Sequence, residues 1–181
     1  MTERPTSPHR NVELKARIDS LAEARDICGQ FATFSAREQQ VDTYFVCPHG
    51  RLKLRERGDQ PSQLVAYSRA DATTPRASDY WLVPVVEPAT MKAALAASLG
   101  VLVVVEKERE VFLYRNVRIH LDRVVDLGEF VEFEAVLAPG DDEPAAARLV
   151  ADLAERLGID PSARVEGSYS DLLLVKQRGG R

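Results

Sequence analysis

Charged residues stand two positions apart in five short stretches of otherwise apolar, β-prone sequence. Side chains two apart on a strand point to the same face, so each stretch predicts a strand with one charged face and one apolar face. A solvated outer face would explain one or two such strands. Five of them, divided into basic and acidic sets, indicate a shared interior that holds ligands for a polyanion and a metal ion. The stretches are Glu13-x-Lys15, Lys53-x-Arg55-x-Arg57, Lys107-x-Arg109, Arg118-x-His120-x-Asp122 and Glu132-x-Glu134.

The bulk properties predict one soluble domain. The chain has 181 residues, of which 45% are hydrophobic, enough for one buried core. No apolar run approaches the roughly 18 residues of a membrane span, and the first ten residues lack the apolar stretch of a signal peptide, so we expect a cytoplasmic protein without membrane contact. Cys28 and Cys47 lack metal-ligand spacing, which argues against a zinc site and a disulfide scaffold.

The charge balance argues against a nucleic-acid partner. With 24 basic and 28 acidic residues the net charge is −4, and stacked aromatic residues do not accompany the basic strands. Most of the lysine and arginine lies in or beside the strand-like segments, whereas much of the acid lies in helical segments and loops. An acidic protein can therefore still hold a basic interior.

Strand and helix signals predict an α+β domain with a large antiparallel sheet, seven or eight strands and three or four helices. We expect a disordered leader over 1–10, a domain over 11–176 and a flexible tail over 177–181. Helices are predicted near 20–29, 89–99 and 142–157, and 168–176 as a short helix or strand. The predicted strands are 12–18, 40–46, 51–57, 63–69, 80–86, 101–113, 116–124 and 129–137.

The acidic strand pair suggests a divalent metal. Glu132 and Glu134 face one way, and two adjacent carboxylates repel each other unless a cation lies between them. Mg²⁺ or Mn²⁺ uses one or two protein carboxylates and takes its other ligands from water and phosphate oxygens. Glu13 and Asp122 on other strands are further candidate ligands. The alternative is a surface pair balanced by lysine or arginine on a neighbouring strand.

The basic residues form the second half of the site. A triphosphate carries about four negative charges, which arginine matches with a bidentate fork and lysine with a point charge. Each basic residue could instead be an ordinary surface side chain, and their common spacing is what favours a site. His120 could contact a leaving group or a base, or pair structurally with Asp122. Arg57, at a strand end, is interpreted as peripheral. The candidate phosphate ligands are Lys15, Lys53, Arg55, Arg69, Lys107, Arg109 and Arg118, and the candidate catalytic residues are Lys107, Arg109 and His120.

No motif for a P-loop, a dinucleotide-binding loop or a hydrolase elbow is present, so side chains must hold any polyphosphate. The charged strands instead resemble the CYTH domain, the family of triphosphate tunnel metalloenzymes that includes class IV adenylate cyclases and thiamine triphosphatases. The resemblance covers about 11–175. It rests on Asn11-Val12-Glu13-Leu14-Lys15, Asp42-Thr43-Tyr44-Phe45, Gly50-Arg51-Leu52-Lys53-Leu54-Arg55, Val105-Glu106-Lys107-Glu108-Arg109, Val117-Arg118-Ile119-His120-Leu121-Asp122, Leu127-Gly128-Glu129-Phe130-Val131-Glu132-Phe133-Glu134 and Ser168-Tyr169-Ser170-Asp171-Leu172-Leu173.

The resemblance implies a closed, eight-stranded antiparallel β-tunnel with flanking helices. By analogy, Glu13, Asp122, Glu132 and Glu134 would bind Mg²⁺ or Mn²⁺, and the seven basic residues would bind phosphates. Asn11 departs from the family's E-x-E-x-K pattern, because an amide stands where the first glutamate would be, which weakens one metal subsite.

Three functions follow as alternatives. The first is a metal-dependent hydrolase of inorganic triphosphate, ATP or thiamine triphosphate. The second is a cyclase that converts ATP to cyclic AMP and pyrophosphate, and the third a protein that binds a phosphorylated ligand without turnover. We expect a monomer or a homodimer.

Overall fold

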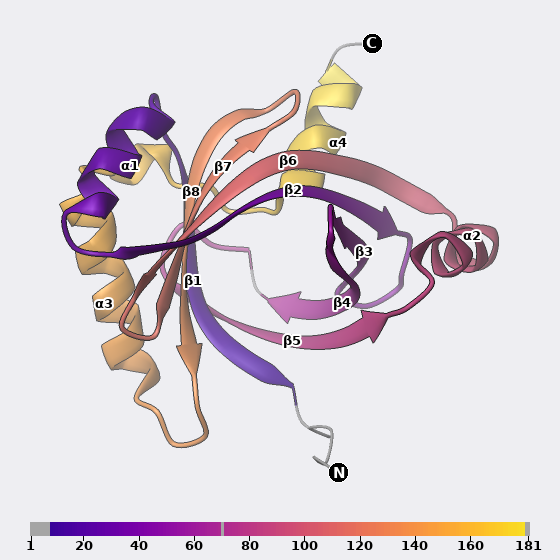
Figure 1. Cartoon of the computed structure of the whole chain (residues 1–181), viewed down its shortest axis with the longest axis horizontal. Coiled ribbons are helices and arrows are strands. Elements are labelled where there is room, and N and C mark those ends of the chain that lie inside the picture. The colour runs from indigo at the N-terminus through magenta and orange to yellow at the C-terminus, as the bar shows by residue number, and fades with distance from the viewer. Residues whose placement is uncertain (1–7, 70, 180–181) are drawn as a thin grey trace.

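Eight antiparallel strands close into one barrel in the computed structural model, which describes residues 8–69 and 71–179. Around the barrel the strand order is β1-β5-β4-β3-β2-β6-β7-β8, and β8 pairs with β1 (Figure 1). The predicted α+β class with a closed eight-stranded barrel is confirmed. The strands are β1 (His9–Arg17), β2 (Thr33–Phe45), β3 (Arg51–Arg57), β4 (Gln60–Arg69), β5 (Arg76–Val85), β6 (Val101–Tyr114), β7 (Val117–Val124) and β8 (Gly128–Leu137).

The largest hydrophobic cluster lies outside the barrel wall. Along β1, Val12, Leu14 and Ala16 are at most 1% exposed and belong to this cluster, whereas Glu13 and Lys15 line the barrel interior. On β1 the period of two thus sends apolar side chains outward and charged side chains inward. The interior is left free for polar chemistry, because apolar burial between the wall and the helices supplies the stability.

Two helices cover this outer face, α1 (Leu21–Gly29) and α3 (Glu143–Arg156), seen together on the left of Figure 1. The Ser20 side chain caps α1 by accepting a hydrogen bond from the backbone N–H of Glu23. The buried helix residues that meet the outer face of β1, β7 and β8 are Leu21, Ala24, Cys28, Ala146, Val150, Leu153 and Ala154.

Two further helices contact the barrel, one on its outer wall and one against inward-facing side chains of the strands. Helix α2 (Pro88–Leu99) packs Met91 and Leu95 against the buried side chains of Phe45 and Leu54. Helix α4 (Tyr169–Gly179), preceded by a short 3₁₀ helix at Pro161–Ala163, inserts Tyr169 and Leu173 into a cluster with residues of β2, β6, β7 and β8. The segment predicted as a helix or a strand is therefore a helix. None of the helices in the described ranges has both the length and the apolar character needed to cross a bilayer.

Several strands begin earlier than the sequence pattern predicts. Strand β2 starts at Thr33 rather than at 40, because its first half pairs with the distal half of β6, from Thr33 opposite Leu113 onward. This half is largely exposed, so it carries no alternating apolar pattern, and strand pairing decides its conformation. β1 begins at His9, inside the predicted leader, and α4 extends to Gly179, inside the predicted tail. The leader's residues 1–7 and the tail's residues 180–181 lie outside the described residues.

Candidate functional site

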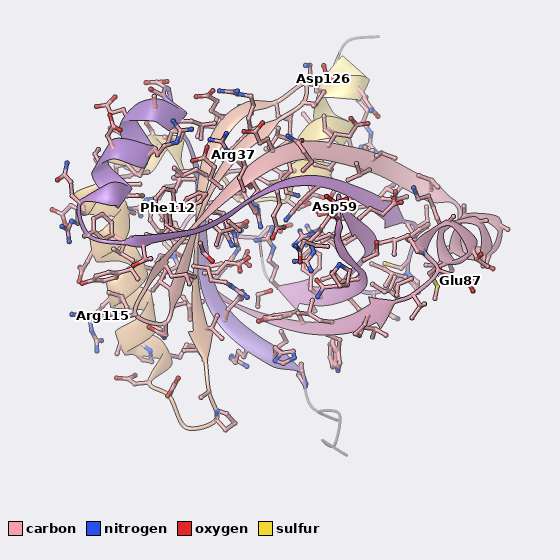
Figure 2. The ribbon with its side chains drawn as sticks, in the orientation of Figure 1. Arg37, Asp59, Glu87, Phe112, Arg115 and Asp126 are labelled. Atoms are coloured by element: carbon pink, nitrogen blue, oxygen red, sulfur yellow. The ribbon has the colours of Figure 1, made fainter. Side chains whose placement is uncertain are left out.

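A cavity of about 300 Å³ lies inside the barrel. All eight strands contribute lining residues, and Tyr169 of α4 contributes one more. Figure 2 shows nitrogen and oxygen atoms of side chains gathered within the ring of strands. The shared polar interior that the spacing of the charged residues predicts is therefore present as one continuous cavity inside the barrel.

Positive charge exceeds negative charge on the cavity lining. Eight lysine or arginine side chains line the cavity against four glutamates, an excess of four positive charges. All seven basic residues predicted to bind phosphate belong to this set. Arg57, which the sequence interpretation treats as peripheral, is the eighth. The basic residues are Lys15, Lys53, Arg55, Arg57, Arg69, Lys107, Arg109 and Arg118, and the glutamates are Glu13, Glu38, Glu132 and Glu134.

Asp42 lies beneath one wall of the cavity and pairs with three of the basic side chains that form it. Its carboxylate is 1% exposed and accepts hydrogen bonds from Lys53 Nζ at 2.9 Å and from Lys107 Nζ at 2.8 Å. It also accepts two bonds from Arg55, at 2.8 and 2.9 Å. Three basic residues from β3 and β6 thus share one counter-ion on β2. Asp42 belongs to the family-like stretch Asp42-Thr43-Tyr44-Phe45, but its place in the site was not predictable from the spacing of charged residues.

The two lysines on this wall are poised between charged and neutral. Burial, together with the positive charge of Arg55 and against the opposing effect of Asp42, lowers the pKa of Lys53 to about 8 and that of Lys107 to about 7. Although burial opposes ionisation of Asp42, the charges of Arg55, Lys107 and Lys53 hold its pKa well below the usual range. The wall is therefore short of negative charge.

A second buried aspartate supports Arg109. Asp122 has no exposed surface and accepts hydrogen bonds from Arg109 at 2.6 and 2.7 Å and from the Tyr169 hydroxyl at 2.7 Å. Tyr169 also presents its ring to Lys15 Nζ, 4.1 Å from the ring centroid. Asp122 is not among the cavity-lining residues, so its role as a metal ligand stays a prediction that requires release by Arg109 and Tyr169.

His120, Glu132 and Glu134 form the one cluster in the described ranges whose ligand atoms are placed to share a metal ion. One ligand atom from each lies within 4.8 Å of the other two. Nδ1 of His120 is buried without a hydrogen-bond partner, 3.6 Å from an oxygen of Glu132. Two carboxylate oxygens and an imidazole nitrogen fit Mn²⁺ or Mg²⁺, with the imidazole favouring Mn²⁺.

Basic side chains form ion pairs with both of these carboxylates. Glu132 pairs with Lys15 and with Arg109, each at 2.9 Å, and Glu134 pairs with Arg118 at 2.8 Å. Although burial opposes ionisation, Lys15 and the neighbouring His120 and Arg109 hold the pKa of Glu132 well below its usual range. The carboxylates are therefore ionised, as metal ligation requires.

Glu13 faces the same cavity but has basic partners of its own. It lies opposite Glu134 in the β1–β8 register and pairs with Arg69 and with Arg76, the latter at 3.5 Å. Asn11, two residues earlier on β1, also lines the cavity, and its side-chain oxygen has no hydrogen-bond partner. The sequence analysis missed Arg76, since no alternating charge marks it at the start of β5.

Comparisons with known proteins agree with this architecture. A protein of Pyrococcus horikoshii OT3 is similar at 22% identity over 90% of this chain and 98% of its own, with a TM-score of 0.76. A candidate adenylate cyclase of Vibrio parahaemolyticus has 21% identity over 93% and 99%, with a TM-score of 0.70. A candidate adenylyl cyclase of Hippeastrum, described with dominant triphosphatase activity, has 12% identity over 92% and 95%, with a TM-score of 0.63.

These three likenesses concern the fold alone. No curated protein matches the sequence. The CYTH domain family matches residues 9–169, which include every strand and the first residue of α4. The chain therefore belongs to the CYTH domain family.

Proposed function

We propose that the protein is a divalent-metal-dependent phosphohydrolase that acts on triphosphates. The observation that carries this proposal is the set of eight basic side chains on the lining of one cavity inside the barrel, beside a buried carboxylate pair. A triphosphate carries roughly four negative charges, which arginine forks and lysine ammonium groups bind well. Membership of a family of triphosphate tunnel enzymes supports the same ligand.

Electrostatic stabilisation is the main task of this site. Phosphoryl transfer to water forms a bond from the water oxygen to the terminal phosphorus and breaks that phosphorus's bond to the bridging oxygen, which leaves with the diphosphate product. The products are orthophosphate and the diphosphate, and the proton lost by the water passes to solvent. Negative charge grows on the leaving oxygen, and preorganised basic groups stabilise it. Asp42 holds Lys53, Arg55 and Lys107 in place before the substrate arrives, which reduces the cost of ordering them.

The acidic side of the cavity fits a divalent metal. We propose Glu132, Glu134 and His120 as its ligands, with Glu13 and Asp122 retained as further candidates. When bound, such an ion supplies an activated water and offsets phosphate charge. Phosphate oxygens compete with these glutamates for Lys15, Arg109 and Arg118, so triphosphate binding frees carboxylates for the metal. Metal and triphosphate should therefore bind cooperatively.

Assays of orthophosphate release and of cyclic AMP formation separate the candidate activities. The proposal predicts orthophosphate from at least one of inorganic triphosphate, ATP and thiamine triphosphate with Mg²⁺ or Mn²⁺, and none after chelation with EDTA. Cyclic AMP with pyrophosphate from ATP would establish the cyclase instead. Tight binding of all three compounds without any product would show that the protein only binds a phosphorylated ligand.

We expect triphosphate binding to take up protons and to weaken as pH rises from about 7 to 9. The pKa values of Lys107, about 7, and of Lys53, about 8, should both rise when phosphate oxygens approach, since the charged forms then gain partners. At pH 8 the uptake should reach about one proton per bound triphosphate. Calorimetric titration in two buffers of different ionisation enthalpy measures this number.

The Lys107→Met variant separates this uptake from protons carried by the ligand itself. Its uptake should be smaller than that of the wild-type protein by a large part of one proton at the same pH. Equal uptake in the two proteins would show that Lys107 does not contact the bound phosphates.

A further inference from the structure

Tyr169 is the one cavity-lining residue in the described ranges that comes from a helix rather than a strand. It is the first residue of α4 and is 4% exposed. Its ring packs edge-to-face against Phe130 of β8, with ring centroids 4.9 Å apart. Its hydroxyl donates a hydrogen bond to Asp122 of β7, and its ring face lies against Lys15 of β1. One side chain of α4 therefore contacts three strands at the site.

The hydroxyl and the ring of Tyr169 are linked through charged residues of the site. The Tyr169 hydroxyl and Nη2 of Arg109 donate to the same oxygen of Asp122, at 2.7 and 2.6 Å. Nη2 of Arg109 also donates to Glu132 at 2.9 Å, and the other oxygen of Glu132 pairs with Lys15 at 2.9 Å. Nζ of Lys15 then lies 4.1 Å from the centroid of the Tyr169 ring. These contacts form a closed network, in which Tyr169 supports both the arginine and the lysine that pair with Glu132.

The first turn of α4 is fixed by contacts outside this network. Oδ2 of Asp171 accepts hydrogen bonds from the backbone N–H and the hydroxyl of Ser168, at 2.7 and 2.6 Å, and from Arg51 of β3 at 2.8 Å. The backbone N–H of Asp171 donates to Ser168 Oγ at 3.3 Å, which completes a reciprocal cap. One turn later Leu173 is buried in an apolar cluster with residues of the strands. α4 therefore holds Tyr169 in one place, so Tyr169 can position the residues that it contacts.

We infer that Tyr169 is a positioning residue, which holds Arg109 through Asp122 and holds Lys15 through its ring. The inference rests on the proposed function. When phosphate oxygens replace Glu132 as the partner of these two basic groups, Asp122 and the Tyr169 ring remain to keep them in place. Basic groups that are ordered before the reaction lower the barrier to phosphoryl transfer more than mobile ones do. Helix α4 then contributes to catalysis as well as to the apolar core.

Tyr169→Phe removes the hydroxyl and keeps the ring over Lys15. It should lower kcat for triphosphate hydrolysis with Mn²⁺ by about tenfold and change KM by less than about threefold, because Arg109 keeps its charge but is held less firmly. Tyr114→Phe is the matched control, since Tyr114 is a partly buried tyrosine of β6 that does not line the cavity. Its kcat should equal that of the wild-type protein. Thermal unfolding of both variants shows that the assay temperature lies below their transitions.

A second background tests whether Tyr169 acts through Arg109. Arg109→Lys keeps the positive charge but cannot bridge Asp122 and Glu132 with a planar fork. Adding Tyr169→Phe to Arg109→Lys should lower kcat by less than about threefold, because the side chain that the hydroxyl positions is already lost. A full tenfold loss in this background, or an unchanged kcat in Tyr169→Phe alone, would overturn the inference.

Nitrogen-15 NMR of the arginine Nε–H groups tests the positioning without turnover. Nε of Arg109 is buried and donates to Asp122 at 2.7 Å, so its proton should exchange slowly with water, and Arg109→Lys identifies its signal. Tyr169→Phe should speed this exchange by about tenfold. If no triphosphate is hydrolysed but the exchange responds in this way, the proposed function fails and the positioning of Arg109 stands. If hydrolysis is observed but the exchange is equal in both proteins, the proposed function stands and the inference fails.

Discussion

Glu132→Gln is expected to lower metal-dependent triphosphate hydrolysis by at least about a hundredfold. The substitution keeps the shape of the side chain but removes one of the two carboxylates in the cluster of His120, Glu132 and Glu134. It also removes the negative partner of Lys15 and Arg109, so the cavity becomes more positive. Metal-free binding of inorganic triphosphate should therefore tighten while turnover falls. Steady-state hydrolysis with Mn²⁺ and calorimetry without metal measure the two effects.

Tighter binding of triphosphate together with slower hydrolysis distinguishes the loss of a metal ligand from misfolding of the variant. A misfolded variant would lose both, and circular dichroism would show it. Glu106→Gln is the matched control, since Glu106 is exposed on β6 and does not line the cavity. Full activity of Glu132→Gln would refute the assignment of Glu132 to the metal.

Asp42→Asn is expected to reduce the free energy of unfolding by about 3–5 kcal/mol. Removing the shared carboxylate leaves Lys53, Arg55 and Lys107 buried without a counter-ion. Urea denaturation at pH 7 measures the change. Asp152→Asn, at an exposed position of α3, removes the same charge and should change stability by no more than about 0.5 kcal/mol.

The destabilisation caused by Asp42→Asn should depend on pH. The pKa of Asp42 is depressed in the folded protein, so its stabilisation is present at neutral pH and lost only as pH falls through that low value. In the variant, Lys53 and Lys107 can relieve their repulsion by releasing protons at higher pH. The destabilisation should therefore be larger at pH 6 than at pH 9. A loss below about 1 kcal/mol at pH 6 would show that the three basic residues are not held by Asp42.

The charged faces of the strands were predictable because charged and apolar residues alternate with a period of two along the sequence. Lys53 and Arg55, or Glu132 and Glu134, alternate with apolar residues, and the structure places both pairs on the cavity. Closure into a barrel was predictable only through the family resemblance. Alternation of charged and apolar residues indicates which face of a strand a side chain occupies, but it does not indicate which strands are neighbours.

The features of the candidate site that the sequence did not predict depend on how deeply side chains are buried and on which strands pair. Asp42 has no charged residue two positions away on its strand, and only the β2–β3 and β2–β6 registers bring it to three basic side chains. Asp122 shares a strand face with His120, yet it lies behind Arg109 rather than on the lining. Arg57, at the end of β3, lines the cavity beside Glu38 of β2, 3.6 Å from its carboxylate. The spacing of charged residues along one strand does not indicate how deeply a side chain is buried or which residues of the neighbouring strands it contacts.

Phosphorus NMR of the wild-type protein with Mn²⁺ and, separately, each of inorganic triphosphate, ATP and thiamine triphosphate follows the proposed hydrolysis product by product. A metal-dependent triphosphatase gives a growing orthophosphate signal and an equimolar diphosphate product, with no change in a parallel sample of Glu132→Gln. Spectra that stay unchanged for all three compounds, or pyrophosphate with cyclic AMP from ATP, would contradict the proposed hydrolysis.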